Sequence, residues 1–125
     1  MFVTKHVVDI TTAADGTASG YTPPVNGRIL QLQYTKDGTT PYDNTVDFTI
    51  IAEDSATPIL TVSDVTATAR YVPRQATQST AGAASLYAAG GAAVNDYVFI
   101  AGERVKITLA QGGDTKTGRF IVWVG

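Results

Sequence analysis

The sequence contains no cysteine and one histidine (His6), and charged residues make up only 16% of its 125 positions. Without cysteine neither a disulfide nor a thiolate zinc site can form, so stability must come from packing or from assembly. The formal net charge of −2 is not the strongly basic footprint expected of a nucleic-acid-binding protein. These absences predict a binding or structural protein, not an enzyme, with no cofactor and no direct contact with nucleic acid.

The chain also has no long apolar run. No stretch approaches 18 consecutive apolar residues, so we expect no transmembrane helix and no membrane partner. Residues 1–6 lack a charged segment followed by an apolar one, which predicts that there is no signal peptide. We therefore expect the protein to stay in the cytoplasm of the cell that makes it, unless it leaves inside a larger particle.

What the sequence does contain is short segments of alternating apolar and polar residues. Leu30, Leu32 and Tyr34 fall on one face of such a segment, as in a strand with one buried face and one solvent-exposed face. Turn signals separate the segments about every ten residues, which is typical of a β-sandwich or a small barrel. We predict an all-β fold, a single-domain antiparallel β-sandwich over residues 1–125 that is jelly-roll-like. The expected strands are 3–12, 28–35, 46–53, 59–65, 94–101, 105–110 and 119–124.

The last of these strands is apolar on both faces apart from Arg119. Such a strand is either central in a sheet or covered by another subunit, and an interface between subunits would suit it. We therefore take Phe120 and Trp123 as candidate interface residues. Trp123, the single tryptophan, is expected in the core or at an interface.

The middle of the chain follows no strand or helix pattern. Residues 76–93 are mostly Ala, Gly, Ser and Thr, and Gly82, Gly90 and Gly91 interrupt any helical stripe. We predict an extended loop over residues 73–93, with one helical turn near 83–88. Loops of this length are uncommon in compact domains and tend to be functional or to be ordered by a partner.

The approach to this loop carries residue types that anchor interfaces. Tyrosine offers a large contact area and arginine makes bidentate hydrogen bonds. A solvated loop with scattered charge is an equally good interpretation of the same residues. The candidate interface residues here are Arg70, Tyr71, Arg74 and Gln75. The N-terminal segment 1–5, with Phe2 and Lys5, is a candidate arm laid over a neighbour, because termini are free unless tied down.

Other polar clusters fit structural roles. Asp9 lies three residues after His6, so in a strand the two point to opposite faces and form no catalytic pair. Asp43, Asn44 and Asp47 could hold calcium, but their spacing matches no EF-hand and Asx residues are equally expected in turns. The glycine-rich segment 112–118 has the wrong order for a phosphate loop and precedes a strand, so it is predicted to be a hairpin loop.

Several segments resemble a known family. They are Ala101–Ile107, Ala110–Phe120, the chain end Ile121–Gly125 and, in the middle, Tyr71–Gln75, about a third of the chain. With the β-rich pattern they look like the small virion proteins of tailed bacteriophages, especially head decoration (cement) proteins.

The resemblance implies a homo-oligomer, commonly a homotrimer, on the capsid surface of the virion. Its partner would be the major capsid protein, whose subunits it would bridge and reinforce, and it would assemble in the bacterial host cytoplasm. Two alternatives remain open. One is another phage role, as a tail-tube, connector or fibre-associated β-domain. The other is a carbohydrate-binding module, in which an exposed Trp or Tyr would stack on sugar rings.

Overall fold

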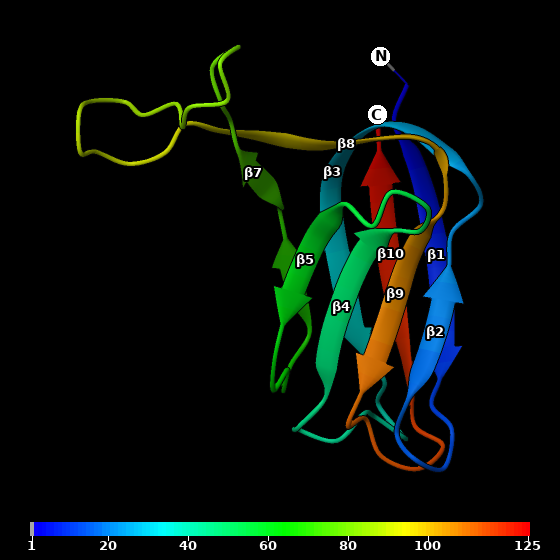
Figure 1. Ribbon diagram of the computed structural model, residues 1–125. Helices are drawn as coiled ribbons and strands as arrows, with labels where there is room; N and C mark the ends of the chain where they lie inside the picture. Colours follow the sequence, from blue (N-terminus) through cyan, green and yellow to red (C-terminus); the bar gives the residue numbers. More distant parts are fainter. Residues whose placement is uncertain (1) are drawn as a thin grey trace.

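The computed structural model describes residues 2–125, and across them the fold is all-β with no helix. Two antiparallel sheets pack face to face as a sandwich (Figure 1). The predicted all-β sandwich is confirmed. The strands are β1 (Thr4–Thr11), β2 (Ala18–Tyr21), β3 (Val25–Lys36), β4 (Asp47–Ala52), β5 (Pro58–Val62), β6 (Ala69–Tyr71), β7 (Arg74–Ala76), β8 (Asn95–Glu103), β9 (Val105–Ala110) and β10 (Thr117–Val124).

Strand pairing follows a nested order. β1 pairs with β10, β2 with β9, β3 with β8 and β4 with β5, all antiparallel. One sheet has the order β1-β10-β3-β8, extended by β6 and β7, and the other has the order β2-β9-β4-β5. This is the pairing of one long hairpin rolled up on itself, which is the jelly roll. The segment that holds β6, β7 and the following loop is inserted between β5 and β8, outside the nested pairs.

Alternation along the strands builds the core. Phe48, Ile50 and Ala52 of β4 are buried, whereas Thr49 between them is exposed. Burying a large apolar side chain contributes roughly 1.5–3 kcal/mol, and it is the main source of stability in a chain without disulfides. Four aromatic rings fill the centre, from both sheets and from the loop before β4: Tyr34, Tyr42, Phe48 and Phe120.

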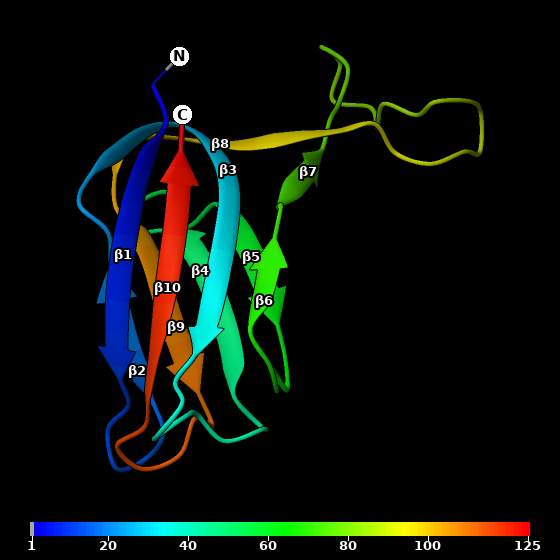
Figure 2. The same ribbon diagram turned by 180° about the vertical axis from the view of Figure 1, so that it is seen from behind.

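The last strand is apolar on both faces because it is central. β10 lies between β1 and β3, and Figure 2 shows it flanked on both sides. Of the two explanations that its pattern allowed, the central position is the observed one. The loop 111–116 before it does not close a hairpin as predicted, since β9 belongs to one sheet and β10 to the other. Gly112 and Gly113 therefore lie in a connection across the edge of the sandwich.

Three short strands are not among those predicted, and one strand is longer than predicted. β2, β6 and β7 have four residues or fewer, too few to show a period of two. The predicted strand 94–101 corresponds to β8, which continues through Gly102 and Glu103 to the corner at Arg104. The predicted helical turn near residues 83–88 is absent. No helix in the described part of the chain is long and apolar enough to cross a membrane.

Candidate interaction surface

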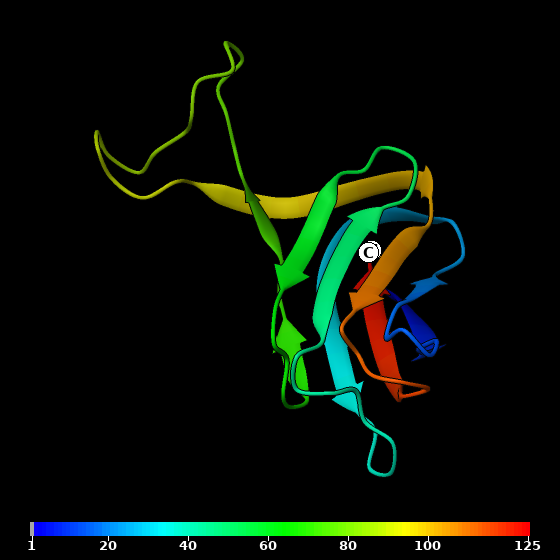
Figure 3. The ribbon, with the colours of Figure 1, turned by 60° about the horizontal axis from the view of Figure 1, so that its bottom comes forward.

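The most unusual feature is an arm, residues 77–94, that leaves the sandwich between β7 and β8. Figures 1 and 3 show it projecting away from both sheets. Its root is a three-way backbone junction: Thr77 donates to Val94, Ser85 donates to Thr77 and Val94 donates to Ser85. Beyond this root the arm has two tight turns, at 79–83 and 87–92, each closed by backbone hydrogen bonds. The arm thus has a defined shape without a core of its own.

The arm is uncharged, and most of its side chains are small. No Asp, Glu, Lys or Arg occurs from Gln75 to Asn95. Its two large apolar side chains face solvent: Tyr87 is 76% exposed and Leu86 is 43% exposed. A projecting segment with exposed large apolar groups and no charge is suited to burial against a partner.

The base of the arm is fixed by stacked cations. The Arg74 guanidinium lies 3.7 Å from the centre of the Tyr97 ring, and the Arg28 guanidinium lies 5.2 Å from it. Arg74 also donates to the carbonyl of the buried Pro73 at 3.0 Å. Cation–π contacts of this kind contribute roughly 0.5–2 kcal/mol. Arg74 therefore holds the arm to the sandwich through the Tyr97 ring, a partner that the sequence did not connect to it.

The other residues of the predicted approach are divided between the sheet and the arm base. Tyr71 packs half-buried against the core, and this burial raises the pKa of its phenol. Arg70 is exposed and its Nε donates to Gln33 of β3 at 3.1 Å. Gln75 pairs with Asp96 in the β7–β8 ladder, and its side-chain amide donates to the Tyr97 carbonyl at 3.3 Å. Of the four, Arg70, Arg74 and Gln75 are exposed and Tyr71 is half-buried.

The predicted N-terminal arm is shorter than expected. Thr4 and Lys5 already belong to β1, and Met1 lies outside the described residues, so only Phe2 and Val3 of segment 1–5 precede the first strand in the described chain. Phe2 is 94% exposed. Lys5 is exposed on the outer face and lies opposite Trp123 in the β1–β10 register.

The two candidates on the last strand have opposite positions. Phe120 is only 2% exposed and touches the rings of Tyr34 and Phe48, so its prediction as an interface residue is wrong. The alternation of a strand places Phe120 inward and Trp123 outward. Trp123 lies half-buried on the outer face, where with Val3, Leu30 and Gln31 it lines an open hollow of about 330 Å³.

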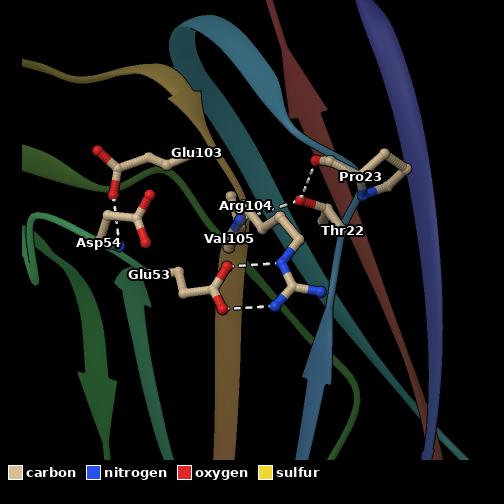
Figure 4. Close-up of polar contacts among 7 residues, drawn as sticks. All are labelled: Thr22, Pro23, Glu53, Asp54, Glu103, Arg104 and Val105. Atoms are coloured by element: carbon tan, nitrogen blue, oxygen red, sulfur yellow. Dashed lines mark hydrogen bonds and ion pairs between the residues drawn. The ribbon is translucent and has the colours of Figure 1, made fainter.

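A polar cluster of the sandwich is joined by an ion pair and several hydrogen bonds (Figure 4). Arg104, at the β8–β9 corner, makes a bidentate ion pair with Glu53, and its guanidinium lies 4.1 Å from the centre of the Tyr21 ring. Glu103 accepts the backbone N–H groups of Asp54 at 2.8 Å and Ser55 at 2.9 Å. These bonds tie the β4–β5 turn to the corner.

A buried hydroxyl completes this cluster. Thr22 donates to the Pro23 carbonyl at 2.9 Å and accepts the Val105 N–H at 3.0 Å (Figure 4). The bonds of Glu103, in β8, to the β4–β5 turn join the two sheets, so the cluster works as a clamp between them.

The contribution of the clamp to the stability of the fold depends on pH. The two backbone N–H groups and the Ser55 hydroxyl hold the pKa of Glu103 below its usual 4.5, and Arg104 lowers the pKa of Glu53. A carboxyl whose pKa is lowered by folding stabilises the fold fully above its unfolded pKa, and this stability is lost as pH falls through the folded pKa. We therefore expect the melting temperature to fall below about pH 4.5.

Glu103→Gln is expected to lower the melting temperature at pH 7 and to make its further fall between pH 5 and pH 3 smaller than in the wild type. Thermal unfolding at a series of pH values measures both effects. Asp114→Asn is a matched control, since the Asp114 carboxylate accepts only the hydroxyl of the adjacent Thr115. An acid-induced fall of the same size in Glu103→Gln and wild type would contradict the assignment.

Within residues 2–125 no group of three or more His, Asp and Glu side chains is arranged to hold a metal ion. The ring of His6 contacts the Thr4 hydroxyl at 3.1 Å. Asp47, the first residue of β4, accepts the Asp64 N–H and the Gln111 side-chain amide, so its carboxylate joins segments far apart in the sequence and does not make a local Asx turn.

Comparison with known proteins leaves the family open. No family model matches the chain, and no curated protein matches it. A crystal structure of FLHE is similar at a TM-score of 0.47 and 10% sequence identity, over 99% of this chain and 98% of that one. A likeness this slight carries no functional argument.

Proposed function

We propose that this protein is a structural component of a tailed-bacteriophage virion that binds the outside of the capsid and joins major capsid subunits. The observation that carries the proposal is the arm 77–94, a shaped, uncharged projection that leaves a compact sandwich and exposes Leu86 and Tyr87. The family resemblance of the sequence supplies the identity of the partner.

The energetics of such a role suit this architecture. Burying a side chain such as Leu86 or Tyr87 contributes roughly 1.5–3 kcal/mol, which is weak for a single site. A capsid repeats its sites, and a homotrimer as implied by the resemblance would present three arms at once. Linked weak contacts multiply into tight binding without a large interface on each chain.

The test removes the arm while keeping the strands. Replacing residues 78–93 by Asn-Gly joins Thr77 to Val94, which already share a backbone hydrogen bond, through a two-residue hairpin turn. Purified wild-type and hairpin proteins are mixed with expanded heads of the phage whose genome encodes the chain, and the bound protein is measured after sedimentation. The wild type is expected to bind at saturating stoichiometry and the hairpin variant to stop binding.

A matched variant keeps the arm and changes its tip. Leu86→Ser/Tyr87→Ser is expected to weaken binding by roughly tenfold or more, since each buried side chain contributes above 1.4 kcal/mol. A wild-type protein without affinity for heads would overturn the proposed function. Wild-type affinity in the hairpin variant would overturn the role of the arm. A ring of six subunits would instead favour a tail or connector role. Glycan binding that is lost in Trp123→Ala would favour a carbohydrate-binding module.

A further inference from the structure

Strand β8 has one occupied edge and one open edge. The backbone hydrogen bonds place β3 and β7 along the same side of β8. Thr77 donates to Val94, so residue 94 faces β7. Arg28 exchanges both backbone bonds with Gly125, so its neighbours 27 and 29 face β8, opposite Ile100 and Val98.

Because backbone groups alternate along a strand, the even residues 94–100 face β3 and β7. The odd residues Tyr97, Phe99 and Ala101 turn their N–H and C=O groups to the other edge. At Tyr97 two side chains take these groups, since the Asp96 carboxylate accepts the N–H at 2.7 Å and the Gln75 amide donates to the carbonyl. No strand of the described chain lies beside Phe99 or Ala101 on this edge.

The other outer strands carry features that discourage pairing with another chain. β1 has Lys5 and Asp9, and Asp9 is ion-paired to Arg119. β2 has only four residues, and β5 begins at Pro58 beside a bulge. Charge, shortness, proline and bulges are the devices that natural sheets use to block edge-to-edge association.

β8 has charged residues only near its two ends, Asp96 and Glu103, and lacks these devices between them. The run 97–101 is Tyr-Val-Phe-Ile-Ala, without charge or proline, in a strand of nine residues. Phe99 is 55% exposed, although it is a large aromatic side chain in the middle of the strand. The unpaired backbone groups of Phe99 and Ala101, beside an exposed aromatic side chain, are a template for pairing with another chain.

We propose that the open edge of β8 pairs antiparallel with β8 of a second copy of this chain. Two identical antiparallel strands are self-complementary about a two-fold axis, so one edge satisfies both copies. With Phe99 opposite Phe99, these two residues exchange their backbone bonds at the axis. Residue 97 lies opposite 101, and bonds between them require the Asp96 and Gln75 side chains to release the Tyr97 backbone groups. A two-fold contact cannot close a trimer, so it joins two free chains or two chains of adjacent trimers. The pairing does not rest on the proposed capsid function.

The absence of cysteine allows a direct test. In Phe99→Cys the two thiols would meet at the two-fold axis, where paired Cα atoms about 5.5 Å apart are within disulfide range. Val7→Cys is the matched control, because Val7 is an apolar strand residue that is 48% exposed on β1. Under mild oxidation in dilute solution, Phe99→Cys is expected to form a covalent dimer several-fold faster than Val7→Cys. Equal rates would overturn the proposal.

The second measurement is the mass of the native protein in solution, without phage heads. One chain is 13.1 kDa, so the wild type is expected at 2 × 13.1 = 26.2 kDa or an even multiple of the chain mass. Phe99→Lys places a charge on the open edge and should halve that mass, with an unchanged melting temperature because the side chain is exposed. A monomeric wild type, or a mass that Phe99→Lys leaves unchanged, would overturn β8 pairing and leave capsid binding to be judged by its own assay.

Discussion

Replacing Phe48 by alanine is expected to lower the free energy of unfolding by about 3–5 kcal/mol. The Phe48 side chain is fully buried, and its ring makes edge-on contacts with Tyr34 at 4.8 Å and with Phe120 at 4.9 Å between centroids. Tyr34 and Phe120 belong to the opposite sheet, so the substitution opens a cavity between the layers. A domain typically has only 5–15 kcal/mol of stability, so the variant should be close to unfolding.

Urea unfolding followed by tryptophan fluorescence measures this loss, because Trp123 is the single tryptophan. Thr49→Ala is the matched control on the same strand, where the exposed side chain should cost less than about 1 kcal/mol. Similar midpoints for the two variants would show that the aromatic cluster does not hold the sheets together.

Much of the sandwich was predictable because alternation records which face of a strand is buried. The pattern of Val46, Phe48, Ile50 and Ala52 identified β4 and its inner face, and all four are buried. Alternation does not indicate to which of the two sheets a strand belongs. The turn residues between β9 and β10 look the same whether the chain folds back beside itself or crosses to the other sheet. The pattern of residues 112–118 therefore predicts a hairpin loop, although the chain crosses between the sheets there.

The candidate surface was predictable as a region but not in detail. Composition alone indicated an extended loop after Pro73. Its anchor is the contact of Arg74 with the ring of Tyr97, which lies far from Arg74 in the sequence and meets it only in the fold. Tyr87 was not singled out, although it is the one aromatic residue in an uncharged segment. Phe99 could have been noticed only with the knowledge that β8 is an edge strand.

The topology explains how an arm can be added without disturbing the core. β6, β7 and residues 77–94 lie between β5 and β8, outside the four nested pairs. Changes in this insertion alter what the protein contacts, while the nested strands keep the aromatic centre. The hairpin variant is therefore expected to melt near the wild-type temperature even where it no longer binds.

Replacing Gly118 by alanine is the second large effect, with an expected loss of about 2–4 kcal/mol. A Cβ at Gly118 would lie 2.5 Å from Cε2 and 2.8 Å from Cζ of Tyr42, and 3.0 Å from Cε1 of Tyr34. Neither ring can yield easily, since the two are stacked and the Tyr42 hydroxyl donates to the buried Ile10 carbonyl at 2.6 Å. Moving Tyr42 would break that hydrogen bond as well as the packing.

The control for Gly118 is another glycine without neighbours. Nothing lies within 4 Å of a Cβ built at Gly38, so Gly38→Ala should leave the unfolding midpoint nearly unchanged. A double-mutant cycle separates the clash from the intrinsic effect of alanine in a strand. In a Tyr42→Ala background the ring is gone, so Gly118→Ala should cost much less than in the wild type. If it costs the same in both backgrounds, contact with Tyr42 is not the reason that glycine is required at this position.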